Sequence, residues 1–513
     1  MAKAVPVSVR RKEASDMDIL TSRIFELPQN PGLRLRDRIC EQVSAAISRG
    51  ALPPGFRMPS CRALAGQLQV SRNTVFAAYS RLVDLGLLEA KDRSGYVVSA
   101  AALPVVPADR GGAAPDTETV DFGPHAPSSL KRVDHPADWA DYPYPFIYNQ
   151  TDPALFPIDA WRECSRQALK RSTLTEWTGE YIAGDSPHLL QQLRQRLLHY
   201  RGVLAGDDEI MVTLGAQNAL AIMGLLFARK AGPIAVEDPG YPDARNAFTL
   251  TGNGVAGVAV DDNGLVPEHI PPACKLVYTT PSHQFPTSVT MTMARREDLV
   301  ARADRDDFFI LEDDYEAEMH GGADASPTLR ALDRNGRVIY VGSLSKTLSP
   351  GLRIGFIVAS RQIIAEARAI RTMLLRHPPT ILQETTALFL GLGYYDRHLR
   401  TLVRRHGERW RRMKAAIDTR LSAFSVRHSV GGTSFWLTGP EGFDATAFSA
   451  SLREEGVIVD AGATFFMARA PKNSFRLGFA YVPEERMERG VDLIAEAAAR
   501  HGVPASLRPP GAS

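Results

Sequence analysis

The sequence predicts an α/β protein of two unequal units: a small N-terminal α/β winged helix-turn-helix, and a large C-terminal α/β unit that ends in a smaller α+β subdomain. The chain has 513 residues, 44% of them hydrophobic, which is too long for one ordinary domain. After Val98 the composition changes, and residues 99–119 are rich in Ala, Pro and Gly without an apolar period, as in a linker. Further on, short apolar runs alternate with helical patterns. We expect units at 32–99 and 121–505, a linker at 100–120, a sheet domain at about 175–390 and a small subdomain at about 393–505.

Composition and charge exclude several classes of protein. The four cysteines, at 40, 61, 164 and 274, lack the paired spacing of a disulfide framework or a zinc site, so we expect buried thiols, no metal and a reducing cytoplasm. No run approaches the ~18 apolar residues that a membrane span needs, so we expect no membrane association. Residues 1–100 hold fifteen Lys and Arg against nine Asp and Glu, which makes this end the candidate nucleic-acid surface.

The first predicted helix covers the stretch "LRDRICEQVSAAISRG". Leu35, Ile39, Val43 and Ile47 recur at four-residue spacing and form one apolar face, and Gly50 is placed to end the helix.

Two further helices and a hairpin complete the N-terminal unit. Ser60 and Ser71 are predicted N-caps of helices that carry Leu64 and Val75 on their apolar faces. The short turn between them makes a helix-turn-helix, and "LLEAKDRSGYVV" supplies a two-stranded wing. The third helix opens with "SRNT", whose polar side chains suit DNA in the major groove. Alternatively, Ser71 is only a cap and Arg72 a solvated residue.

The run "LPPGFRMPSCRALAGQLQVSRNTVFAAYSRLVDLGLL" and the wing glycine Gly95 closely resemble the winged helix-turn-helix of the GntR superfamily. The resemblance implies that this unit binds double-stranded DNA. It assigns the following DNA contacts to the helices and the wing tip: Arg62, Ser71, Arg72, Asn73, Thr74, Arg93, Ser94 and Gly95.

The large unit reads as a largely parallel sheet with functional groups at its strand ends. Apolar runs of strand length stop in polar, Gly or Pro loops, as in "EIMVTLG", "PIAVEDPGY", "KLVYTTPSHQ", "FFILEDDY" and "RVIYVGSLSK". From about Gly393 a long basic helix, two short β-like runs and a terminal helix from Pro483 predict an α+β subdomain.

A lysine stands at one strand end in "VGSLSKTLSPGLRIGF", among serines and ahead of Arg353. A partly desolvated lysine beside phosphate donors suits a Schiff base with a phosphorylated aldehyde, and pyridoxal 5′-phosphate meets these needs. That cofactor also needs a carboxylate for its ring nitrogen, for which Asp313 is placed at another strand end. Tyr315 follows two residues later, to hydrogen-bond the ring oxygen.

The remaining contacts of the cofactor are also present in the sequence. "TLGAQNALAIM" reads as a strand, a Gly turn and a helix start at Ala216 and Gln217, which would seat a phosphate. Tyr241 is the candidate ring to stack on the pyridine. Taken alone, Lys346 could be a solvated loop residue, and Asp313 a capping carboxylate.

From about Tyr148 to about Ala498 the chain resembles a fold-type I, class I aminotransferase, and as a whole it is similar to the MocR/GabR subfamily of GntR regulators. The motifs that carry this are "VEDPGYPDAR", "TTPSHQFPT", "LEDDYEAE" and "GSLSKTLSPGLRIG". The resemblance implies that Lys346 forms the Schiff base and that Arg476 grips a ligand carboxylate. It assigns the cofactor to Ala216, Gln217, Tyr241, Asp313, Tyr315, Ser343, Lys346 and Arg353.

Four residues depart from the family pattern. Ser288 stands where the family commonly has glycine, and Phe285 stands where aminotransferases commonly have an asparagine at the ring oxygen. Asn149 and Gln150 occupy a place where a glycine often lies near the substrate. The first pair of departures disfavours efficient transamination.

Together these features predict a cytoplasmic transcription factor that senses a small amine or amino acid as an external aldimine with Lys346 displaced, and the resemblance implies that it is a dimer. Ligand binding alone can shift such an equilibrium, so turnover is unnecessary. One alternative is an active aminotransferase with an incidental DNA-binding domain, and another is a DNA-binding protein with a vestigial cofactor fold.

Overall fold

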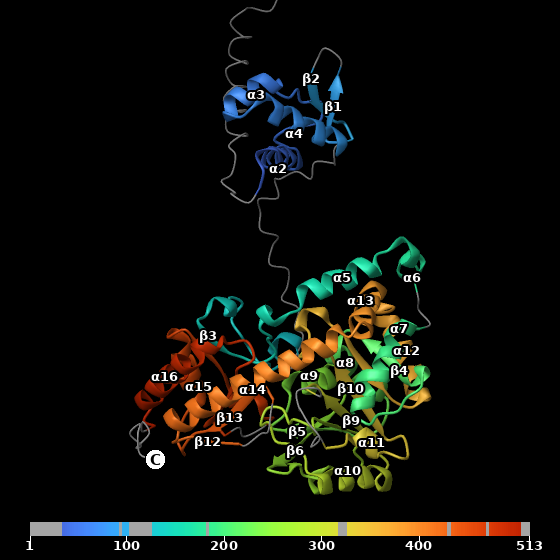
Figure 1. The fold of residues 1–513 in the computed structure, drawn as a ribbon, viewed down its shortest axis with the longest axis vertical. Coiled ribbons are helices and arrows are strands. Elements are labelled where there is room, and N and C mark those ends of the chain that lie inside the picture. The colour runs from blue at the N-terminus through green and yellow to red at the C-terminus, as the bar shows by residue number, and fades with distance from the viewer. Residues whose placement is uncertain are drawn as a thin grey trace, which may run out of the picture. The chain divides into compact units, whose positions relative to one another are not determined.

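The computed structural model describes residues 33–91, 95–101, 126–180, 184–316, 326–427, 432–467 and 471–503. The chain divides into two compact units, Met1–Phe122 and Gly123–Ser513. Figure 1 labels their elements along the chain. In the described part of the chain, no helix has the length and apolar character needed to cross a bilayer.

The residues of the N-terminal unit that the structure describes form three helices and a hairpin. The helices are α2 (Leu35–Ser48), α3 (Cys61–Leu68) and α4 (Arg72–Asp84), and strands β1 (Leu88–Lys91) and β2 (Gly95–Val98) pair antiparallel. The hydroxyl oxygen of Ser60 accepts from the Ala63 amide at 3.1 Å, and that of Ser71 accepts from the Thr74 amide at 3.1 Å. Both predicted N-caps are therefore confirmed.

The core of this unit includes Val43, Leu64, Val75 and Tyr79, as their helical spacing predicts. Two expectations are wrong in detail. Leu35, the first residue of α2, is 45% exposed and lies outside the buried core of this unit. Cys61, the first residue of α3, is only partly buried, whereas the cysteines at 40, 164 and 274 are buried.

The C-terminal unit is built on an eight-stranded sheet. Its strand order is β4 (Ile210–Thr213), β11 (Gly355–Val358), β10 (Val338–Ser343), β9 (Phe309–Asp314), β8 (Leu276–Thr279), β5 (Ile234–Asp238), β6 (Val255–Asp261) and β7 (Gly264–Leu265). The five strands from β10 to β6 run parallel, which confirms the largely parallel sheet. Strand β11 is antiparallel to both neighbours, and β7 is antiparallel to β6.

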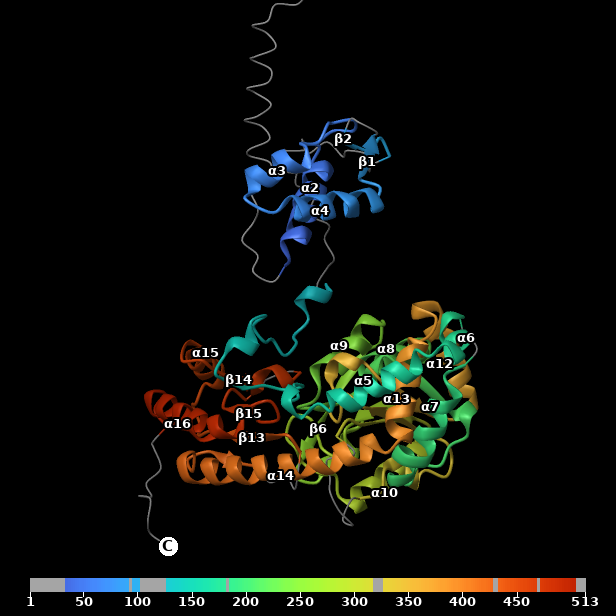
Figure 2. The same cartoon turned by 45° about the horizontal axis from the view of Figure 1, so that its top comes forward.

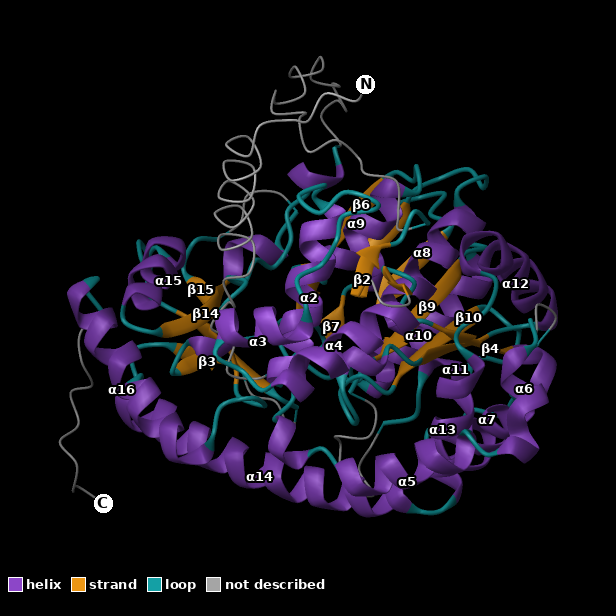
Figure 3. Ribbon diagram, turned by 90° about the horizontal axis from the view of Figure 1, so that it is seen from above, coloured by secondary structure: helices purple, strands orange, loops and turns teal. Residues whose placement is uncertain are grey.

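Helices cover both faces of this sheet, and Figure 3 shows the orange strands enclosed by purple helices. Side chains such as Leu311 and Ile339 pack with α8 (Gly215–Phe227), α9 (Pro242–Leu250) and α12 (Arg361–Leu375). Their neighbours Ile310 and Val338 point to the other face, against α10 (Met293–Arg305) and α11 (Leu329–Leu332). The strands are thus apolar on both sides. The remaining helices of this part are α5 (Ile158–Ala168), α6 (Leu174–Thr178), α7 (Pro187–Gln192) and α13 (Thr380–Gly391).

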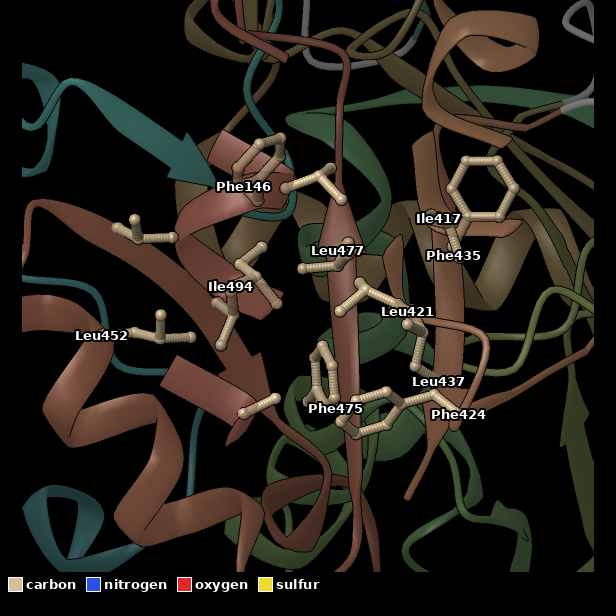
Figure 4. Packing of buried hydrophobic residues seen from close by; sticks show 14 of the residues in the cluster. Phe146, Ile417, Leu421, Phe424, Phe435, Leu437, Leu452, Phe475, Leu477 and Ile494 are labelled. Atoms are coloured by element: carbon tan, nitrogen blue, oxygen red, sulfur yellow. The ribbon is translucent and has the colours of Figure 1, made fainter. Parts of the chain in front are cut away.

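A second sheet forms the smaller subdomain. Its order is β12 (Ser425–Val426), β13 (Ser434–Thr438), β15 (Ser474–Gly478), β14 (Val457–Ala461) and β3 (Tyr144–Phe146), with helices α14 (Tyr394–Arg420), α15 (Ala445–Glu454) and α16 (Glu484–Arg500). Helix α14 lies against both α13 and α16, and Figure 2 shows it running past the small sheet. Strand β3, which the sequence did not predict, pairs parallel to β14, and Figure 4 shows its Phe146 in the same core as Leu477.

Candidate functional site

One pocket of the C-terminal unit is lined by every residue predicted to hold the cofactor. Asp313 is the second-last residue of strand β9, Ser343 ends β10, and Lys346 follows three residues later. Because β9 and β10 are parallel neighbours, their carboxyl ends lie at the same edge of the sheet. The other predicted residues in the lining are Ala216 and Gln217 in the first turn of α8, Tyr241 at the N-cap of α9, Tyr315 and Arg353.

Lys346 is buried, with 7% of its surface exposed. Its Nζ lies 3.6 Å from the ring centroid of Tyr148 and 5.8 Å from that of Tyr315. Burial lowers the pKa of Lys346 from 10.5 to about 7, with Glu316 opposing this shift and Arg476 adding to it. A lysine in this state supplies a neutral, nucleophilic amine near neutral pH.

One carboxylate oxygen of Asp313 is hydrogen-bonded and the other is not. The Tyr278 hydroxyl donates to Oδ2 at 2.9 Å, whereas Oδ1 is buried and has no hydrogen-bond partner. Burial raises the pKa of Asp313 to about 7, and the Tyr278 hydrogen bond opposes that rise. An unpartnered carboxylate oxygen in a pocket fits a cationic ring nitrogen, which would supply both the hydrogen bond and the compensating charge.

The other end of the pocket has the features of an anion seat. Helix α8 begins at Gly215, which has a φ of +76°, and a Cβ there would lie 2.8 Å from Nη2 of Arg353. The same Nη2 donates to the Leu214 carbonyl at 2.9 Å, which fixes the guanidinium beside the start of the helix. The Ser345 hydroxyl is buried there without a partner. A helix N-terminus, an arginine and an unpartnered hydroxyl together fit a phosphate.

Aromatic rings surround the space between these ends. Tyr241 and Phe285 are in edge contact at 5.2 Å, and Phe285 also meets Tyr148 at 4.5 Å. The Tyr315 hydroxyl is buried without a hydrogen-bond partner, as expected of a group that awaits a ring oxygen. The residues present therefore fit pyridoxal 5′-phosphate.

Arg476 lies in the adjoining pocket, on strand β15, and is 1% exposed. Its guanidinium carbon is 4.7 Å from the ring centroids of both Tyr148 and Phe285. Its Nη1 is 3.7 Å from Oδ2 of Asp460, and neither Nε nor Nη1 has a hydrogen-bond partner. Lys346 and Arg476 line this pocket together with Asn149, Gln150, Thr151, His406 and Thr433, among others.

Sequence reasoning missed a buried acidic group near Lys346. Glu316 accepts from the Thr433 hydroxyl at 2.5 Å, and its Oε2 lies 3.5 Å from Nε2 of His283. Burial by itself would raise the pKa of Glu316, but His283, Lys346, the Thr433 hydrogen bond and Arg476 together outweigh burial and lower the pKa. Glu316 directly follows the predicted site residue Tyr315, and this adjacency in the sequence could have placed it near the pocket. Its hydrogen bond with Thr433 joins distant segments and could not have been predicted.

In the N-terminal unit, the predicted DNA contacts occupy the start of α4 and the neighbouring α3. Arg72 and Asn73 are exposed in the first turn of α4, and Arg62 is exposed on α3. The Ser71 hydroxyl caps the helix and lies 2.8 Å from that of Thr74. Gly95, with a φ of +83°, begins β2. Arg93 and Ser94 lie outside the described residues.

Comparison with known proteins places both units. Residues 35–98 match the model of the bacterial regulatory proteins of the gntR family, and residues 151–494 match that of aminotransferase class I and II. The HTH-type transcriptional regulator TauR of Rhodobacter capsulatus is 41% identical over 94% of this chain and 100% of its own length. The probable rhizopine catabolism regulatory protein MocR of Rhizobium meliloti is 27% identical, over 92% of this chain and 95% of its own.

Aminotransferases share only the C-terminal part. Aromatic-amino-acid aminotransferase 1 of Thermococcus litoralis is 30% identical over 67% of this chain and 85% of its own. The solved kynurenine aminotransferase of Pyrococcus horikoshii is 28% identical, with a TM-score of 0.65 over 70% of this chain and 91% of that one. This aminotransferase fold is that of a family dependent on pyridoxal 5′-phosphate. The chain therefore belongs to the MocR/GabR subfamily of GntR transcriptional regulators, in which a winged helix-turn-helix is joined to a class I aminotransferase domain.

Proposed function

We propose that this regulator binds DNA through its winged helix, holds pyridoxal 5′-phosphate, and responds to a small amine or amino acid. The carrying observation is the shared pocket of Lys346 and Asp313, in which a lowered lysine pKa stands beside an unpartnered carboxylate oxygen. We further propose that the working division is 32–99 for DNA, 100–120 for the linker and 121–505 for the effector, and that the protein acts as a homodimer on two half-sites.

The pocket residues divide the work of holding the cofactor. Ala216 and Gln217 at the start of α8, together with Ser343 and Arg353, would hold its phosphate, and Tyr241 would stack on its ring. Bound pyridoxal 5′-phosphate supplies an aldehyde that primary amines capture reversibly. Lys346 is the amine that the protein itself supplies. Because its pKa is lowered, it is partly unprotonated and nucleophilic near neutral pH.

Asp313 and Tyr315 set the electronic state of the ring. Oδ1 of Asp313 would hold a proton on the ring nitrogen and the Tyr315 hydroxyl would donate to the ring oxygen, since both atoms are buried without a hydrogen-bond partner. Phe285 offers no hydrogen bond at that oxygen, so this pocket favours capture of an amine over the proton transfers of transamination.

Arg476 selects the effector. It is buried, and Nε and Nη1 are available as donors in a pocket shared with the Lys346 amine. A ligand with an amine at one end and a carboxylate at the other can place its amine at the Lys346 end of this pocket and its carboxylate at Arg476, whose guanidinium suits bidentate pairing with a carboxylate.

The test replaces Arg476 with Ala in the full-length protein. We expect amino acids to bind with ~1.5 to 3 kcal/mol less free energy, roughly ten- to a hundredfold in dissociation constant, since a charge-assisted contact is lost. Visible absorbance of the bound cofactor should remain, because Lys346 is intact. A titration of absorbance and reporter transcription with amino acids measures both, and an unchanged midpoint contradicts the role of Arg476.

A second candidate function is aminotransferase activity with an incidental DNA-binding domain. The 30% identity to the Thermococcus litoralis enzyme and the full set of pocket residues favour it. Many turnovers per site with an amino donor and a keto acid, together with DNA binding that no amine changes, would support this candidate and exclude sensing.

A further inference from the structure

Arg476 has a buried counter-ion that is held slightly out of reach. Arg476 on β15 and Asp460 on β14 are direct cross-strand partners, and both side chains are almost fully buried. Nη1 and Oδ2 are 3.7 Å apart, beyond the ~2.7 to 3.2 Å of a hydrogen bond. Oδ2 of Asp460 has no hydrogen-bond partner either. The guanidinium of Arg476 and the carboxylate of Asp460 therefore attract each other but form no hydrogen bond.

The other oxygen of Asp460 is engaged from a different part of the chain. Nε2 of His135 lies 2.7 Å from Oδ1, within hydrogen-bond distance, and the His135 side chain is 16% exposed. His135 precedes β3 and belongs to neither of the two strands. One oxygen of Asp460 thus faces an imidazole and the other faces the guanidinium, so the two groups compete for one carboxylate.

An anionic effector would compete with Asp460 for the guanidinium of Arg476. Arg476 is held over Tyr148 and Phe285 by ring contacts, which do not use its Nε or Nη1 donors. A second anion at those donors would stand beside the charge of Asp460, and the repulsion between them is strong at a buried site. The affinity of an anionic effector therefore depends on how firmly Asp460 is drawn away from Arg476.

Resting on the proposed role of Arg476 in binding an anion, we propose that Asp460 is the positioning counter-ion of this arginine. His135 draws the carboxylate toward itself and leaves the guanidinium able to accept a second anion. Asp460 and His135 thereby set how strongly the site prefers an amine that carries an anionic group over the same amine without one.

The experiment measures this preference on full-length protein loaded with pyridoxal 5′-phosphate. Glycine is compared with methylamine, alanine and β-alanine with ethylamine, and phenylalanine with phenethylamine, each titrated by cofactor absorbance. The preference is the dissociation constant of the plain amine divided by that of the matching amino acid. Wild type is compared with Asp460→Asn, His135→Ala, His135→Gln and Arg476→Ala.

The variants are expected to shift the preference in opposite directions. Asp460→Asn removes the competing charge and should raise it about tenfold. His135→Ala frees Asp460 to close on Arg476 and should lower it several-fold. His135→Gln keeps a donor for Asp460 and should restore it to near the wild-type level. A merely structural role would weaken amines and amino acids alike and leave the ratio unchanged.

The outcomes separate this inference from the proposed function. If wild type shows no preference in any pair, or Arg476→Ala keeps it, the anion-binding role of Arg476 fails. If Arg476→Ala loses the preference but Asp460→Asn and His135→Ala leave it unchanged, or shift it the same way, the counter-ion role alone is overturned. Should Asp460→Asn fail to retain the cofactor, the two His135 variants decide, and equal ratios for both overturn the proposal.

Discussion

Replacing Lys346 with Met in the cofactor-free protein should stabilise the C-terminal unit at neutral pH. Burial lowers the pKa of this lysine from 10.5 to about 7. Folding at neutral pH must therefore either bury a charged ammonium group or remove its proton, and both reduce the free energy of unfolding. A change of that size corresponds to roughly 3 to 5 kcal/mol of destabilisation that Met, of similar length and without charge, does not carry.

The sign follows from proton linkage. Between pH 7 and 10.5 the unfolded lysine binds the proton that the folded one has lost, so wild type gains stability as pH rises through this window. Below the folded pKa the penalty stays constant. The advantage of Lys346→Met should therefore be largest at pH 7 and below, and should shrink by roughly 2 kcal/mol on going to pH 9.

Tryptophan fluorescence reports the unfolding of the C-terminal unit alone, because the five tryptophans all lie in the range from Trp139 to Trp436. Denaturant unfolding at pH 7 and 9 gives the two free energies of unfolding for each protein. Lys472→Met, which removes a lysine whose side chain is 74% exposed, is the matched control and should change little. An advantage of Lys346→Met that is absent, or that grows with pH, would refute the reasoning.

Two further predictions concern the cofactor contact and the DNA contact. Tyr278→Phe removes the donor to Asp313, should raise the pKa of that carboxyl further, and should weaken cofactor binding by ~0.5 to 1.5 kcal/mol in equilibrium dialysis. Tyr340→Phe, which removes the analogous donor to Asp314 at 3.0 Å outside the pocket lining, should leave cofactor affinity unchanged, and equal losses would contradict the assignment. Arg72→Ala should weaken binding to a genomic fragment selected by wild type, and lower the slope of log affinity against log salt by about one, with cofactor absorbance unchanged. The exposed Arg49 provides a control, and an Arg49→Ala variant with the same loss would remove Arg72 from the interface.

The sequence predicted those parts of the site that depend on local pattern. Asp313 and Lys346 follow apolar runs of strand length, and parallel strands bring their carboxyl ends to one edge whatever the loops between them do. The caps at Ser60 and Ser71 depend only on residues three positions away. Such features can be predicted because their cause lies within a few residues.

The features that were missed depend on pairing between distant segments. Strand β3 has three residues, too few to show a period, and exists because β14 supplies its partner. The nearness of Asp460 to Arg476 is a matter of register between β14 and β15. Tyr148 gave no local signal in the sequence, since its contact with Lys346 depends on where β3 is placed.

Strand β3 connects the pocket lining directly to the small sheet. A loop can absorb the displacement of a side chain next to it, whereas a hydrogen-bonded strand passes the displacement on to its sheet. Strand β3 ends at Phe146, and Tyr148, two positions later, holds its ring against the Lys346 amine. A displacement of the Tyr148 ring would therefore reach the small sheet within two residues, because β3 is hydrogen-bonded to β14 in that sheet.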